Sequence, residues 1–181
     1  PNLLSSYDGG LNWISGPVID NIWWKSTSIG SPGLIVGVGT YYDSTVAKGF
    51  IYRTSDYGLS WHIIDTDQEL TRVEMKTKDI GYASSIRTIY KTTDSGLSWS
   101  SILTAGNDGG FYQMDFLDSI KGTIIEGYKI RQTTNGGKNW ITTDFNLPIS
   151  GSQDLKYNIY GDLFIAGGGA LLMIPSSEKN I

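Results

Sequence analysis

The sequence has no cysteine, one histidine and only four arginines among its 181 residues. The lack of cysteine excludes disulfide scaffolds, thiol catalysis and cysteine-ligated zinc, but it leaves the redox compartment open. No apolar run approaches the roughly 18 residues that a membrane-spanning helix needs, so we expect no membrane span. A formal net charge of -4 with so few arginines argues against a nucleic-acid partner.

Turn-forming and aromatic residues are, by contrast, plentiful. The chain holds 23 glycines, and 39% of its residues are hydrophobic, 12% aromatic and 18% charged. This composition excludes a disordered tail or a coiled coil, and the length suits one domain. Because the sequence opens at Pro1 with neither a Met nor an apolar leader, we expect a processed or trimmed chain.

An eight-residue motif, [ST]-x-[DN]-x-G-x-x-W, occurs four times, at residues 6–13, 54–61, 92–99 and 133–140. Its tryptophans are separated by 48, 38 and 41 residues, a period typical of propellers and solenoids. Residues 175–181 resemble a decayed fifth copy, with Glu178 near the acidic position.

Between the copies, short runs of alternating apolar and polar residues are bounded by Gly, Asp, Asn and Ser, which indicates strands and turns. We predict four strands per repeat, with the motif in the hairpin between the third and the fourth. The predicted strands are 21–28, 34–41, 50–54 and 61–65, then 70–76, 80–85, 88–92 and 98–103, then 111–117, 122–127, 130–133 and 140–145, and finally 155–159, 163–166 and 171–174.

The predicted fold is therefore an all-β propeller of four-stranded antiparallel blades, with about 4 to 4.5 blades in this chain. We divide the single domain into a half blade at 1–18, blades at 19–66, 67–104 and 105–146, and a partial blade at 147–181. Either the ring closes at four blades with an extra or swapped strand, or the chain is a fragment of a larger ring. We favour the fragment.

The repeated residues have clear tasks in a tight hairpin. The glycine supplies a positive φ, and the preceding Asp or Asn accepts hydrogen bonds from the N–H groups of the turn. The tryptophan fills the gap between hairpins, while its N–H finds a backbone acceptor. The structural set comprises Asp8, Gly10, Trp13, Asp56, Gly58, Trp61, Asp94, Gly96, Trp99, Asn135, Gly137 and Trp140.

This pattern resembles the Asp-box, or BNR repeat, of sialidases, xyloglucan-degrading hydrolases, sortilin-type receptors and the photosystem II stability/assembly factors. The resemblance implies a β-propeller in which the motif lies away from the ligand face, so we assign it a structural role. Members of the assembly-factor group bind proteins rather than catalyse, but their binding surface is rich in arginine. This chain departs from them in that respect.

Ligands of propellers usually bind at the channel that the innermost strands line. Alternation on these strands places Ile22, Trp24, Val73, Met75, Met114, Phe116, Leu155, Tyr157 and Ile159 on the core side. The opposite side supplies the candidate ligand-binding residues Trp23, Lys25, Arg72, Glu74, Gln113, Asp115, Lys156 and Tyr160, although a solvated channel would favour the same residues. Arg53, Lys91 and Arg131, near the ends of third strands, are interpreted as surface decoration.

Most of these observations favour a non-catalytic recognition or assembly scaffold that binds a protein or a glycan. One alternative is a glycoside hydrolase, sialidase-like or glucan-degrading, for which Asp115 and Glu74 are the only nominated acids. The other is a viral or cell-surface attachment module. We expect no cofactor and no metal, a location that is extracellular, periplasmic, lumenal or on a virion, and a possible homo-oligomer through open blade edges.

Overall fold

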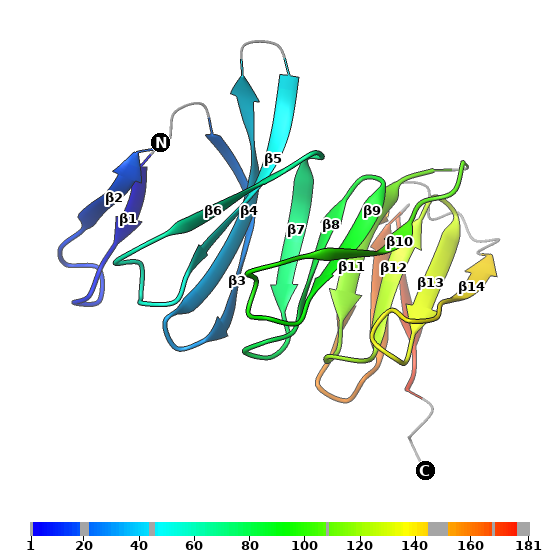
Figure 1. Cartoon of the computed structure of the whole chain (residues 1–181). Coiled ribbons are helices and arrows are strands. Elements are labelled where there is room, and N and C mark those ends of the chain that lie inside the picture. Colours follow the sequence, from blue (N-terminus) through cyan, green and yellow to red (C-terminus); the bar gives the residue numbers. More distant parts are fainter. Residues whose placement is uncertain are drawn as a thin grey trace. The chain divides into compact units, whose positions relative to one another are not determined.

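The structure is a computed structural model that describes residues 2–18, 22–43, 46–107, 109–144, 152–167 and 169–176. These residues form seventeen β-strands and no helix (Figure 1). None of them belongs to a helix long and apolar enough to cross a membrane. Most of the proposed fifth motif copy, at 177–181, lies outside the described residues.

Three sheets have four antiparallel strands each, and every one follows the chain order. They comprise β3 (Ile22–Ser31), β4 (Leu34–Asp43), β5 (Val46–Thr54) and β6 (His62–Thr66); β7 (Leu70–Met75), β8 (Gly81–Ser85), β9 (Thr88–Thr92) and β10 (Ser100–Thr104); and β11 (Phe111–Phe116), β12 (Gly122–Glu126), β13 (Lys129–Thr133) and β14 (Ile141–Asp144).

Two smaller sheets lie at the ends of the chain. The first pairs β1 (Asn2–Ser5) with β2 (Ile14–Val18), and the last contains β15 (Ser152–Tyr157), β16 (Leu163–Gly167) and β17 (Ala170–Ile174). The predicted all-β fold with four-stranded antiparallel sheets is thereby confirmed. Every predicted strand has a counterpart, and the largest difference is an earlier start for β5, because the β4–β5 ladder continues to Asp43 opposite Val46.

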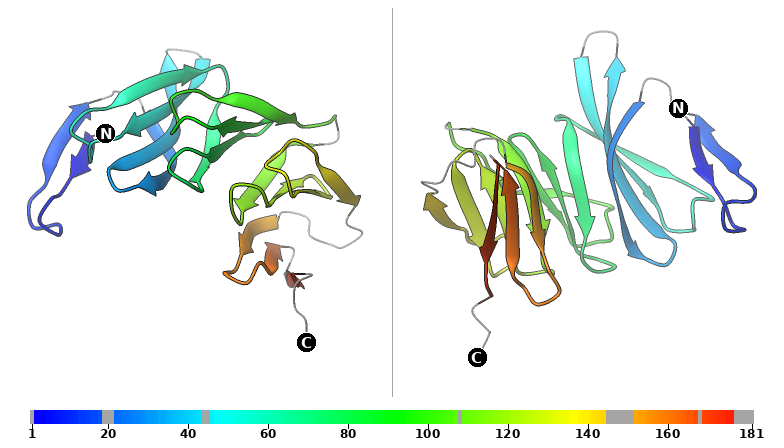
Figure 2. Two further views of the ribbon diagram at one scale, coloured as in Figure 1. Left: turned by 60° about the horizontal axis from the view of Figure 1, so that its bottom comes forward. Right: turned by 180° about the vertical axis from the view of Figure 1, so that it is seen from behind.

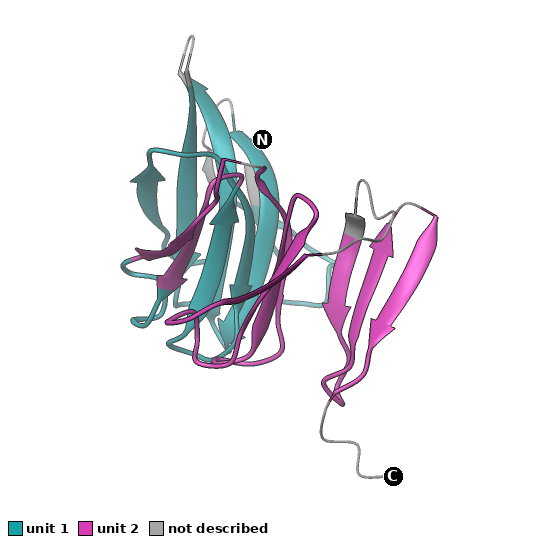
Figure 3. Cartoon of the chain, turned by 90° about the vertical axis from the view of Figure 1, so that its right-hand side faces the viewer, with its two compact units in different colours: residues 1–85, 92–98 teal, residues 86–91, 99–181 magenta. Residues whose placement is uncertain are grey.

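The strands group into two compact units (Figure 3). Residues 1–85 and 92–98 form the first unit, and residues 86–91 and 99–181 form the second. Within the second unit, β15–β17 lie beside β11–β14 (Figure 2), where β11 contacts β15. The division into a half blade, three blades and a partial blade stays a prediction.

Each unit has its own apolar core. In the first, Ile22, Phe50 and Tyr52 are buried, and the ring of Tyr52 stacks on Trp61 with centroids 4.5 Å apart. In the second, one buried cluster takes residues from two neighbouring sheets: Ile125, Ile130, Leu155, Leu163 and Ile165. Burial of this cluster holds the three-stranded sheet against the four-stranded one.

On the first strand of each sheet, the side chains alternate between the buried and the more exposed side as predicted, with two exceptions. Ile159 was expected in the core, but this prediction is wrong: its side chain is 88% exposed. Strand β15 ends at Tyr157, and a turn closed by the Asn158 N–H on the Asp162 carbonyl, 2.9 Å away, carries Ile159 and Tyr160 outside the sheet. The second exception is Asp115, which is buried rather than facing an open channel.

Candidate functional site

The hairpin motif forms the same hydrogen-bonded turn in all four copies, with its positions numbered one to eight from the hydroxyl residue to the tryptophan. In the second copy, Thr54 Oγ1 accepts from the Gly58 N–H at 2.9 Å, and Asp56 Oδ1 accepts from the Ser60 N–H at 2.9 Å. The fourth copy retains the second bond with an amide oxygen, since Asn135 Oδ1 accepts from the Asn139 N–H at 2.9 Å. The aspartate thus caps the turn with its oxygen, and no charge is required for that role.

The chain has a positive φ at position four as well as at the glycine of position five. Tyr57 and Ser95 adopt φ values of 61° and 64° at position four, where the first and fourth copies have glycine. Non-glycine residues rarely take this conformation, and the turn hydrogen bonds offset its cost. Sequence reasoning expected a positive φ at the glycine alone.

Hydrogen bonds hold the motif carboxylates in their ionised form. The pKa values of Asp8 and Asp56 fall from 3.8 to about 2, chiefly because Asn12 donates to Asp8 and Ser60 donates to Asp56. Burial works against this effect at Asp94, but hydrogen bonds led by that of Ser98 still lower its pKa. These carboxylates are therefore permanent negative charges near neutral pH.

The motif tryptophans differ in how their indole N–H is satisfied. Trp61 Nε1 donates to the Gly58 carbonyl at 3.0 Å, as predicted. Trp140 Nε1 is buried and has no acceptor among the described residues. The ring of Trp140 instead meets Phe116 edge-on, with centroids 6.3 Å apart.

Successive motif turns are joined through the carbonyl of position four. The Tyr7 hydroxyl donates to the Tyr57 carbonyl at 2.9 Å, and Arg53 Nε donates to the Ser95 carbonyl at 2.7 Å. In the second unit, Lys91 Nζ donates to the equivalent carbonyl of Gly136 at 2.8 Å.

The interpretation of Arg53, Lys91 and Arg131 as surface decoration is therefore wrong. Arg53 donates to the Ser95 carbonyl within the first unit, and Lys91 donates to the Gly136 carbonyl within the second. Arg131 lies one position earlier in its copy, and its guanidinium pairs with the buried carboxylate of Glu126.

The two nominated acids lie in different units, and each is engaged within its own. Asp115 is buried in the second unit, where Lys156 Nζ donates to Oδ1 at 2.9 Å and the Tyr157 N–H donates to Oδ2 at 2.6 Å. Glu74 pairs with Lys76 at 3.0 Å in the first unit. The Asp115 carboxylate thus fastens β11 to β15.

The remaining candidate ligand residues are distributed over both units. Trp23 and Lys25 are exposed on β3, with 63% of the Trp23 side chain accessible, and Arg72 is half-buried on β7. Gln113 is half-buried on β11. Tyr160 is exposed in the turn after β15.

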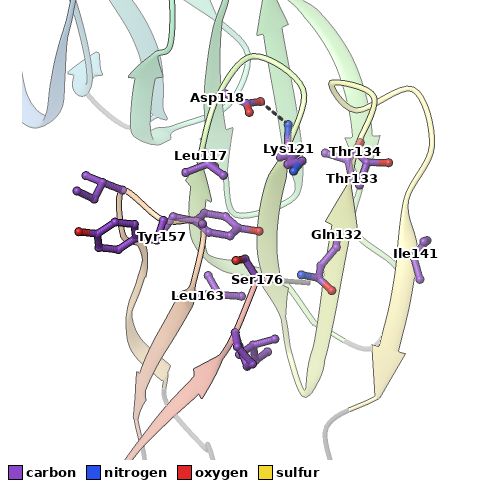
Figure 4. Close-up of a pocket in the computed structure, with 15 residues that line it drawn as sticks. Leu117, Asp118, Lys121, Gln132, Thr133, Thr134, Ile141, Tyr157, Leu163 and Ser176 are labelled. Atoms are coloured by element: carbon purple, nitrogen blue, oxygen red, sulfur yellow. Dashed lines mark hydrogen bonds between the residues drawn. The ribbon is translucent and has the colours of Figure 1, made fainter. Parts of the chain in front are cut away.

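The second unit also contains a cavity of about 570 Å³ (Figure 4). Its walls come from the β11–β12 turn, the start of the fourth motif copy, strand β14 and the β15–β16 turn. The lining residues are Leu117, Asp118, Lys121, Gln132, Thr133, Thr134, Ile141, Tyr157, Ile159, Tyr160, Gly161, Leu163, Ile174, Pro175 and Ser176.

The cavity combines apolar walls with hydroxyl and amide groups and two charged side chains, Asp118 and Lys121. Asp118 is the one carboxylate among its lining residues, and Oδ1 accepts from the N–H groups of Ile120 and Lys121 at 2.7 Å each. Gln132 points toward the cavity in Figure 4, and its Nε2 donates to Thr123 at 3.4 Å. A lining with a single carboxylate suits recognition through polar and apolar contacts better than hydrolysis by a pair of carboxyl groups.

Of the predicted ligand residues, only Tyr160 lines this cavity. The other lining residues were not predicted, because the candidate ligand residues were sought on the first strand of each sheet. The cavity lies instead at the ends of those strands and at the fourth motif copy. The turn at 118–121 and the motif start at 133–134 correspond to 77–80 and 92–93 of the preceding repeat, which are also mostly polar, and this recurrence is the signal that could have found them. Among the described residues, no group of three or more His, Cys, Asp or Glu side chains could hold a metal ion.

Comparisons with known proteins bear on the fold. No protein-family model matches the chain, and no curated protein matches its sequence. YCF48 from Cyanidioschyzon merolae superposes with a TM-score of 0.67 at 17% identity, over 90% of this chain and 56% of that protein. This chain thus spans just over half of that structure's length.

Two further structures are similar at a lower level. A structure of YCF48 bound to D1 peptide has a TM-score of 0.44 at 20% identity, over 98% of this chain and 72% of that one. A HIRA fragment of residues 644–1017 has a TM-score of 0.47 at 10% identity, over 82% of this chain and 48% of that one. At such identities the similarity to YCF48 from Cyanidioschyzon merolae establishes the fold, which is that of a β-propeller.

Proposed function

We propose that the chain is a non-catalytic scaffold of Asp-box blades that recognises a protein segment. One observation carries the proposal: the cavity of the second unit has apolar walls, hydroxyl and amide groups, and only two charged side chains among its lining residues, Lys121 and Asp118, of which Asp118 accepts hydrogen bonds from its own turn. A volume of about 570 Å³ is within the range of specific binding pockets and accommodates a few peptide side chains.

The hydrogen bonding of the nominated acids supports recognition over glycoside hydrolysis. A hydrolase of this kind needs two carboxyl groups facing one another across the substrate. The two oxygens of Asp115 accept from Lys156 and Tyr157, and Glu74 pairs with Lys76, so both carboxylates have structural partners. The four motif turns support the Asp-box assignment through their shared hydrogen bonds and positive φ values.

Selection from a phage-displayed library of random peptides tests this function. Thr134→Arg should fill the cavity without unfolding the turn, because Thr134 is exposed and the first copy tolerates Tyr7 at the same position. Thr93→Arg places the same side chain at the same position of the third copy, in the first unit, and is the matched control.

Peptides enriched on the wild-type protein should lose binding to the Thr134→Arg protein and keep it with Thr93→Arg. A failure to enrich any peptide, or equal binding to both variants, would refute recognition at this cavity. A glycan array and fluorogenic glycosides, run in parallel, separate the alternatives: glycan capture or turnover of a glycoside would overturn the proposal.

A further inference from the structure

Leucine recurs at position six of the motif in the first three copies, and all three side chains face solvent. Leu11 is 84% exposed, Leu59 is 78% exposed and Leu97 is 53% exposed. The fourth copy has Lys138 at this position, also exposed, and its turn forms the same hydrogen bonds. Since a lysine is accepted there, the turn itself does not require leucine.

These three turns belong to one unit and follow one another along it (Figure 1). The Tyr7–Tyr57 hydrogen bond joins the first turn to the second, and the Arg53–Ser95 hydrogen bond joins the second to the third. Tyr7 and Tyr57 are themselves more than half exposed. The leucines and tyrosines therefore form one row of apolar side chains, which we call the leucine row.

Negative charge accompanies the leucine row. Asp8, Asp56 and Asp94 lie three residues before the three leucines, and hydrogen bonds keep them ionised. The first unit as a whole holds ten acidic and six basic residues, which accounts for the chain's net charge of -4, while the second unit holds eight of each. Positive charge on a partner that covers the leucine row would therefore strengthen its binding to the first unit.

We propose that the leucine row is a second interaction surface, which binds a protein segment that combines apolar side chains with lysine or arginine. Exposed apolar side chains grouped on one surface mark interaction sites, and the flanking carboxylates select the charge of the partner. This surface lies in the first unit, whereas the cavity of the proposed function lies in the second, so the two are tested independently.

The binding probe is a fluorescent amphipathic peptide of about 18 residues, or about five helical turns, with leucine on one face and lysine on the other. A control peptide, the Leu/Glu peptide, has glutamate in place of every lysine. The test protein carries Leu11→Lys, Leu59→Lys and Leu97→Lys together, each copying the natural Lys138. A second protein carries Asp8→Asn, Asp56→Asn and Asp94→Asn, each copying the natural Asn135. Leu171→Lys, at an exposed leucine of the second unit, is the control.

Fluorescence anisotropy should show that the Leu/Lys peptide binds the wild-type, Leu171→Lys and Thr134→Arg proteins alike. The leucine triple variant should bind it at least about tenfold more weakly, the asparagine triple variant should lose most of its salt dependence, and the Leu/Glu peptide should not bind. Circular dichroism must show that both triple variants stay folded. If the folded leucine variant binds as tightly as wild type, or the wild-type protein does not bind the Leu/Lys peptide, the proposal fails.

Two other occupants of the row give different outcomes. If sedimentation shows a wild-type dimer that the leucine variant abolishes, a second copy covers the row and the proposal is overturned. Binding of the wild-type protein to vesicles of anionic phospholipid that the same variant abolishes would assign the row to a membrane surface instead. Thr134→Arg tests the cavity alone and leaves the leucine row unchanged. Failure of the proposed function at the cavity can therefore be told apart from failure of the leucine-row proposal.

Discussion

The side chain of Arg53 donates from Nε to the main-chain carbonyl of Ser95, 2.7 Å away, and so joins the third strand of one sheet to the motif turn of the next. Ser95 occupies position four of its motif turn, where it has a φ of 64°. Lys91 repeats the contact at Gly136. In both cases a basic residue that directly precedes a motif copy donates to a main-chain carbonyl at position four of another copy.

Replacing Arg53 with Ala should destabilise the protein by about 1 kcal/mol, because a partly buried, charge-assisted hydrogen bond is lost. Arg53→Lys should restore part of the stability, since Lys91 makes the same contact with an ammonium group. Urea denaturation measures the difference. Equal stability of the wild-type and Arg53→Ala proteins would show that the link carries no net energy.

The motif aspartates should make the free energy of unfolding depend on pH in the acid range. The pKa of Asp56 is about 2 in the folded protein and near 3.8 when unfolded, so the unfolded state binds more protons. Its contribution is present in full above the unfolded value and is lost as the pH falls from 3.8 toward 2. Asp56→Asn, which copies Asn135, should remove this part of the acid sensitivity and leave a folded turn. Urea midpoints measured across that pH range compare the two proteins. Parallel pH profiles would contradict the assignment.

Gly58→Ala should be destabilising by about 1–2 kcal/mol, because Gly58 adopts a φ of 87° that disfavours a Cβ atom. Ser95→Ala keeps a side chain at position four and removes only the hydroxyl contact to Asp79, so it should cost less. Thermal denaturation distinguishes them. A smaller loss for Gly58→Ala than for Ser95→Ala would argue against strain at position five.

Asp115 distinguishes the structural role from a catalytic one. Asp115→Ala leaves the Tyr157 N–H without its acceptor and should cost about 1–3 kcal/mol. Asp115→Asn keeps an oxygen for that bond and should cost less. Denaturation of the two variants gives the comparison. A variant that is as stable as wild type yet abolishes a measured glycosidase activity would assign Asp115 to catalysis.

The sequence predicted the strands well because short alternating runs and regular turn residues determine them locally. Copies of the motif in register also predicted which strands pair. The roles of Arg53 and Asp115 were not predicted, since each depends on how one sheet meets the next. Ile159 illustrates the same limit: its alternation suited a strand, but hydrogen bonds within 158–162 end β15 first.

The cavity was likewise beyond a strand-by-strand analysis. Its walls combine the β11–β12 turn, the fourth motif copy and the β15–β16 turn, which are more than 40 residues apart at the extremes. Only the packing of two sheets in the second unit brings them together.

Hydrogen–deuterium exchange with and without a peptide selected on the wild-type protein tests the central claim most directly. A scaffold that binds through the second unit should show slower exchange at 117–121, 132–134 and 157–161, the segments that line the cavity, and unchanged exchange in the β7–β8 hairpin. Protection confined to the first strands β3 and β7, with no change in those three segments, would contradict recognition at the cavity.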